Sequence, residues 1–136
     1  MKTSSGKYLI TLDPDDQLVC GLLDELYKHS KDNEYDIIQY QHEVLSKRGE
    51  IGKTEAMPVA SGIFNRTEIL KIKWKTWSLC RICVKRSLML KGISAIQNNL
   101  SYMIGSEDLV LFFSVLLFVN NYKVIDYFGY IYTYIN

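Results

Sequence analysis

Three carboxylates stand within four positions near the start of the sequence, at Asp13, Asp15 and Asp16. Carboxylates this close repel one another unless a cation or hydrogen-bond donors compensate, and oxygen-rich clusters of this kind suit Mg²⁺ or Mn²⁺. Asp15 and Asp16 would also cap a following helix well, because helix N-termini favour acidic side chains. The stretch therefore predicts either a divalent-metal site or a solvated turn that caps the next helix.

The residues before the carboxylates predict where they are held. Tyr, Ile and Thr favour extended backbone, so residues 8–12 (YLITL) predict a short buried strand. Pro14 biases Asp13 away from helix, and the DPDD sequence is typical of a turn. The carboxylates then follow the carboxyl end of a strand, which is the edge where open α/β sheets bind ligands.

Composition narrows the class of protein. The 136 residues fit one domain, 48% hydrophobic content supports a core, and a net charge of +1 gives no footprint for nucleic acid. Three cysteines, an odd number, indicate a reducing compartment, and the Cys80–Cys83 pair lacks the second pair of a zinc site. The longest apolar run, residues 109–119, is too short to span a bilayer. We expect a cytoplasmic protein, or one peripheral to a membrane, with no transmembrane segment.

Hydrophobic periodicity and turn residues predict an alternating α/β chain with a mixed sheet flanked by helices. Irregular or looped segments are expected at residues 46–54, 57–63 and 98–105. The expected strands cover residues 8–12, 35–40, 74–84 and 123–135, the last as one or two strands. The expected helices cover residues 16–30, 65–72 behind a capping box, 88–91 ended by Gly92, and 106–119.

Several stretches, in this order, resemble family 2 glycosyltransferases, which have the GT-A fold. Residues 6–16 (GKYLITLDPDD) are similar to the segment of that family that ends in D-x-D-D. The other similar stretches are residues 22–27 (the helix after that motif), 35–38 (a D-I-hydrophobic strand), 77–86 (an acceptor-side W-to-R segment), 105–109 (the late E-D motif) and 130–134 (an aromatic strand). The resemblance implies a partial GT-A fold, with residues 1–136 forming the C-terminal portion of the family domain, beginning at the D-x-D strand.

The resemblance also implies an activity, namely inverting transfer of a sugar from a nucleotide-diphospho-sugar to a saccharide or other acceptor hydroxyl. Asp15 would ligate the Mn²⁺ or Mg²⁺ that bridges the diphosphate. Asp13 would lie near the ribose or the metal, as a second metal residue, and Asp16 would support the turn on the substrate side.

The late motifs supply the acceptor side of the implied site. Asp108 would be the base that takes the acceptor proton, with Glu107 as its neighbour, and Trp77 and Arg86 would belong to the acceptor-binding segment. A helix N-terminus stabilises a carboxylate as an anion, which keeps Asp108 ionised but weakens it as a base.

Two departures from the family pattern affect these expectations. The family carries an N-terminal half that grips the nucleotide base, whereas this sequence starts just before the D-x-D strand. The resemblance therefore implies the family's activity without establishing that the fragment is active in isolation. No histidine follows His42, so a late histidine metal ligand is absent. Without neighbouring strands, the strand at residues 8–12 should become a sheet edge, and exposed apolar edges promote self-association.

Two other functions remain open from the residues alone. An apolar strand that ends in D-x-D also marks haloacid-dehalogenase-type phosphatases, in which Asp13 would be the nucleophile and Asp15 the acid/base. Gln17 and Pro14 fit that signature poorly. The third reading is a non-catalytic, truncated relative that acts as a binding or interaction module.

Overall fold

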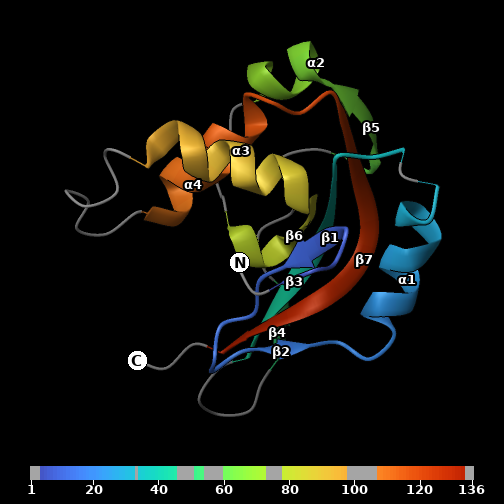
Figure 1. The fold of residues 1–136 in the computed structure, drawn as a ribbon. Coiled ribbons are helices and arrows are strands. Elements are labelled where there is room, and N and C mark those ends of the chain that lie inside the picture. The colour runs from blue at the N-terminus through green and yellow to red at the C-terminus, as the bar shows by residue number, and fades with distance from the viewer. Residues whose placement is uncertain are drawn as a thin grey trace.

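A mixed β-sheet with helices on both faces forms the protein (Figure 1). The computed structural model describes residues 4–32, 34–45, 51–53, 60–72, 78–97 and 107–133. The strands are β1 (Tyr8–Ile10), β2 (Gln17–Leu18), β3 (Ile37–Leu45), β4 (Ile51–Lys53), β5 (Gly62–Asn65), β6 (Ile82–Lys85) and β7 (Asn121–Thr133). The helices are α1 (Leu22–Ser30), α2 (Arg66–Lys71), α3 (Arg86–Ile96) and α4 (Glu107–Leu116), with a 3₁₀ turn, η1 (Leu79–Arg81), before β6.

The sheet has the order β1-β6-β3-β7-β2, with β4 paired to β3 and β5 to β7. β3 and β7 are parallel, and the other pairs are antiparallel. The carboxyl end of β1, the amino end of β6 and the carboxyl-terminal halves of β3 and β7 therefore meet at one edge of the sheet. This is the edge where the acidic turn lies.

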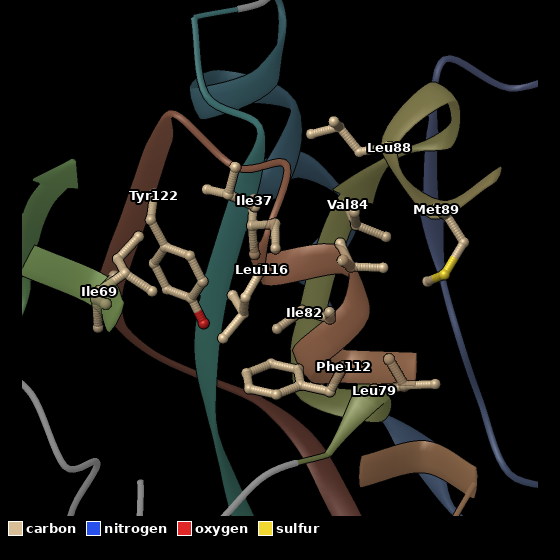
Figure 2. Close-up of a cluster of buried hydrophobic side chains, with 13 residues drawn as sticks. Ile37, Ile69, Leu79, Ile82, Val84, Leu88, Met89, Phe112, Leu116 and Tyr122 are labelled. Carbon is tan, nitrogen blue, oxygen red and sulfur yellow. The ribbon is translucent and has the colours of Figure 1, made fainter. Parts of the chain in front are cut away.

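Two hydrophobic clusters fill the spaces between the sheet and the helices. α1 covers one face and buries Leu22 and Leu26 against Ile38 and Tyr40. α2, α3 and α4 cover the other face, and Figure 2 shows the cluster beneath them. Its labelled members are Ile37, Ile69, Leu79, Ile82, Val84, Leu88, Met89, Phe112, Leu116 and Tyr122. The mixed α/β architecture expected from the sequence is confirmed.

At the edge opposite the acidic turn, the Asp36 carboxylate ties three strands together. Oδ1 accepts from Lys85 Nζ at 2.8 Å, and Oδ2 accepts from the backbone N–H groups of Asn120 and Asn121 at 2.8 and 3.2 Å. Burial alone would raise the pKa of Asp36, but these donors outweigh it and lower the pKa. The start of β3 is thus fixed to the end of β6 and the start of β7.

β1 is shorter and more exposed than the sequence predicts. The strand ends at Ile10, its side chains are only half-buried, and Leu12 is 49% exposed. β1 pairs only with β6 among the described strands, so the expectation of a sheet edge is confirmed. The expected self-association stays a prediction.

The segment after the acidic turn differs most from expectation. The sequence predicts a helix over residues 16–30, whereas α1 begins at Leu22 and Gln17–Leu18 form β2. The Asp16 carboxylate does not cap a helix, because its oxygens accept hydrogen bonds from β7. Gly21, with φ of +88°, takes the left-handed conformation that turns the chain into α1.

Gly92 does not end a helix as the sequence predicts. α3 runs from Arg86 to Ile96 through Gly92, which is buried where α3 packs against α4. A Cβ there would lie 2.5 Å from Val115 Cγ2 and 3.1 Å from Val115 N. The glycine is therefore needed for the close approach of the helices, not for a helix C-cap.

The remaining predicted elements agree in kind but differ in extent. Asn65 caps α2 with the expected capping box to Glu68. β3 extends to Leu45, β4 occupies part of the expected loop at 46–54, and β5 begins within the segment 57–63 expected to be irregular. The expected strand at 74–84 is η1 followed by β6 in its described part, and the C-terminal segment is one strand, β7. The expected loop at 98–105 lies outside the described residues.

No helix in the described part of the chain has both the length and the apolar character needed to cross a membrane.

Replacement of Gly92 by alanine should lower the free energy of unfolding by about 1–2 kcal/mol, because overpacking outweighs the higher helix propensity of alanine. Urea unfolding would measure this change. Gly62→Ala is the matched control: its Cβ would meet side-chain atoms at an ordinary 3.5 Å, so its effect should stay within about 0.5 kcal/mol. Equal effects of the two variants would contradict the packing role of Gly92.

Candidate functional site

A cavity of about 420 Å³ opens at the sheet edge where β1 ends. The topology explains why, since the acidic turn, η1, the outer half of β3, the end of β7 and the first turn of α4 all come to this edge. The residues that line it are Asp13, His42, Ser78, Arg81, Asp108, Tyr130 and Tyr132.

The acidic turn is fixed to the central strand β7 through Asp16. Its carboxylate is 8% exposed, and Oδ2 accepts from the Tyr130 hydroxyl at 2.5 Å while Oδ1 accepts from Thr133 N at 2.7 Å. The same Tyr130 oxygen accepts from Asp13 N at 3.3 Å, and Asp16 N donates to the Asp13 carbonyl at 3.1 Å. Both oxygens of Asp16 are therefore used inside the protein, which matches a role in supporting the turn.

Asp13 places its carboxylate at the cavity, where it has one described side-chain donor. The Cys80 thiol donates to Asp13 Oδ2 at 3.4 Å and accepts from Thr11 Oγ1 at 3.8 Å. Burial raises the pKa of Cys80, which keeps the sulfur protonated and able to donate. The rest of the Asp13 carboxylate is exposed and available to a ligand.

Asp108 lies in the first turn of α4 and faces the same cavity as Asp13. Partial burial, and then the negative charges of Asp13 and Glu107, raise the pKa of Asp108. The helix N-terminus alone would lower it, so burial and like charge prevail over the effect expected from the sequence. A raised pKa makes this carboxylate a stronger base than an ordinary aspartate.

Arg81 is a cavity residue that the sequence reasoning missed. Its side chain is 4% exposed, and Nη1 lies 3.1 Å from His42 Nδ1. One signal could have indicated it: Arg81 interrupts the apolar run LCRICV at residues 79–84, and arginine is almost never fully buried without a special reason.

The structure separates the other expected site residues. Asp15 is exposed and does not line the cavity, so only Asp13 of the D-x-D pair does. Glu107 is exposed beside Asp108 on α4. Arg86 begins α3 at the far end of β6, where its backbone N–H donates to the Lys7 carbonyl at 2.9 Å, and it does not reach the lining of the cavity. Trp77 lies outside the described residues.

The cavity could hold a divalent cation only with help from a ligand. Within the described ranges, no three His, Cys, Asp or Glu side chains gather as a metal-binding group. The exposed carboxylate of Asp13 nevertheless supplies hard oxygen donors at the cavity, and Asp15 is exposed two positions further along the same turn. Mg²⁺ is commonly held by one or two carboxylates, with water and substrate phosphates completing its shell. The donor set therefore fits a metal that arrives with a phosphorylated substrate.

Comparison with known proteins gives a fold but no sequence family. No family model and no curated protein matches the sequence. Solved structures of S. aureus TarS, a glycosyltransferase, do match it. TarS residues 1–349 in complex with UDP-GlcNAc superimpose with a TM-score of 0.70 at 18% identity, over 99% of this chain and 37% of that chain. A longer TarS structure gives 0.72 at 16% identity, over 98% of this chain and 23% of that one.

The chain has a partial glycosyltransferase fold. The identities are too low to carry more than the fold. The chain spans about a quarter to just over a third of the length of these TarS chains. TarS residues 1–349 have also been solved in complex with UDP, which matches over 98% of this chain with a TM-score of 0.70.

Replacement of Tyr130 by phenylalanine should lower the free energy of unfolding by about 1–3 kcal/mol, because it leaves the buried Asp16 carboxylate without one of its donors. Thermal or urea unfolding would measure the loss. Tyr27→Phe on the exposed side of α1 is the matched control and should be nearly neutral, since Tyr27 is 67% exposed. A neutral Tyr130→Phe would show that the turn is held by other contacts.

Proposed function

We propose that this chain carries the metal side and the acceptor side of a family 2, inverting glycosyltransferase centre. The observation that supports this most directly is that Asp13 and Asp108, far apart in the sequence, line one cavity at the edge where β1 ends. Displacement at C1 of a sugar requires the leaving group and the base on opposite sides of one pocket. Two carboxylates that line one cavity can supply the two groups, one on the leaving-group side and one as the base.

Asp108 is the proposed base. It would accept the proton of an acceptor hydroxyl as the hydroxyl oxygen bonds to C1 of the donor sugar and the bond from C1 to the diphosphate oxygen breaks. The proton goes to Asp108 and the bonding electrons leave with the diphosphate, so the configuration at C1 is inverted. The raised pKa of Asp108 supports this role, because proton transfer improves as the pKa of the base approaches the working pH.

Asp13 and Asp15 are the proposed residues for Mn²⁺ or Mg²⁺ on the donor side. A divalent cation bound there would neutralise the negative charge that develops on the departing diphosphate. The donor class is supported by the neighbouring fold, since TarS has been solved with UDP-GlcNAc and with UDP. The acceptor roles of Glu107, Trp77 and Arg86 rest on the family resemblance.

Manganese titration by calorimetry tests the metal side. Asp13→Asn should weaken Mn²⁺ binding at least tenfold, because one of the few carboxylates of the site is lost, and Asp15→Asn should weaken it as well. Asp24→Asn, in the exposed first turn of α1, is the matched control and should bind as the unchanged chain does. Equal affinity in all four proteins would exclude a metal site at the D-x-D turn.

Release of UDP from UDP-GlcNAc, with Mn²⁺ present and water or a sugar as acceptor, tests the base. Asp108→Asn should reduce the rate about 10²- to 10⁴-fold, as expected when a positioned base is lost. The rate of the unchanged chain should rise with pH through a pKa above the ordinary aspartate value, because deprotonated Asp108 is the active form. The Asp24→Asn control should keep the full rate, and a full rate in Asp108→Asn would show that the base lies elsewhere.

A further inference from the structure

Arg81 carries a buried positive charge, and no acidic side chain among the described residues forms an ion pair with it. The side chain is 4% exposed, yet it lines the cavity with Asp13 and Asp108. None of the ion pairs found among residues 4–32, 34–45, 51–53, 60–72, 78–97 and 107–133 includes Arg81. Burial of a cation without a counter-ion is unfavourable for folding. Such a residue indicates a negatively charged partner other than the described side chains, and a ligand in the cavity can supply it.

His42 orients the guanidinium without neutralising it. Arginine has only donor N–H groups, so His42 Nδ1 must accept the hydrogen bond from Arg81 Nη1 at 3.1 Å. Burial, and then the positive charge of Arg81, lower the pKa of His42 to about 4. The imidazole is therefore neutral at physiological pH. It fixes one edge of the guanidinium through Nη1 and leaves other N–H groups for the cavity.

We propose that Arg81 binds an oxyanion, a phosphate or carboxylate group, of the ligand that occupies this cavity. Its planar guanidinium matches the paired oxygens of such groups. Ser78 Oγ, which accepts from Cys80 N at 3.1 Å, keeps its own proton and can donate to the same group. The inference rests on the proposed function only in taking this cavity as the ligand site, and it adds Arg81 as the residue that binds a negative group of that ligand.

Two sources could supply the oxyanion. One is the diphosphate of a nucleotide-sugar donor, and the other is a negatively charged acceptor. Inorganic pyrophosphate represents the first, glucuronate represents the second, and glucose is the uncharged reference. Each probe is titrated into the protein and its binding is measured by calorimetry. EDTA is present in every titration, so that binding at Arg81 is separated from binding at any metal site.

The unchanged chain should bind pyrophosphate or glucuronate at least tenfold more tightly than Arg81→Met does, whereas glucose should show no difference between the two. Without ligand, Arg81→Met should unfold at the same temperature as the unchanged chain or higher, because an unbalanced charge has been removed. Arg66→Met is the matched control: Arg66 is exposed, and its Nε donates to the Val119 carbonyl, away from the cavity. It should keep the oxyanion affinity.

Arg81→Gln keeps an N–H donor for His42 and decides the question if the methionine variant fails to fold. It should also lose the oxyanion affinity at least tenfold. Oxyanion affinities that are the same with and without Arg81 would overturn the inference, even if sugar transfer is shown. Arg81-dependent binding of pyrophosphate or glucuronate would support it even if no UDP is released, so the two proposals can fail separately.

Discussion

The buried Asp16 carboxylate is the interaction on which the site depends. β1 is a short edge strand with half-buried side chains, so it cannot by itself hold the residues that follow it in one place. Asp16 fixes them to the longest strand of the sheet, because its two oxygens accept from Tyr130 and from the backbone of Thr133. Asp13 is then held at the cavity by the same tyrosine hydroxyl. One carboxylate of the acidic cluster is structural, and it positions another at the cavity.

The sequence predicted those parts of the fold whose signals are local. Local sequence is enough to predict three of these parts. They are the capping box at Asn65, the apolar helix α4, and β7 with its β-branched and aromatic residues. The sequence-based prediction failed where a residue's role depends on a contact with a residue far away in the sequence. Asp16 has the residue type of a helix cap, but donors more than a hundred positions away take its oxygens. Gly92 has the residue type of a helix end, but Val115 on another helix determines its role.

The candidate site could be predicted only in part, again because its residues come from segments far apart in the sequence. The order of the motifs predicted that Asp13 and Asp108 belong to one pocket, and both residues line the same cavity; their roles stay predictions. The acceptor role that the resemblance gives to Arg86 stays a prediction. Arg81 lines the cavity and Arg86 does not, because the two arginines flank β6 and only the topology shows which end faces the acidic turn. η1 adds a further obstacle, since a 3₁₀ turn interrupts the alternation by which a strand assigns its side chains to faces.

The cavity combines two exposed carboxylates with a buried guanidinium, and this combination limits the ligands that suit it. A neutral sugar would leave Arg81 unbalanced, and an anion without hydroxyls would pair with Arg81 but would give Asp13 and Asp108 no donors. A ligand that carries both hydroxyls and an oxyanion can satisfy both groups at once. Its negative group, once bound near Asp108, would raise the pKa of that carboxylate further through like-charge repulsion. Ligand binding would therefore strengthen the proposed base at the time when an acceptor hydroxyl must be deprotonated.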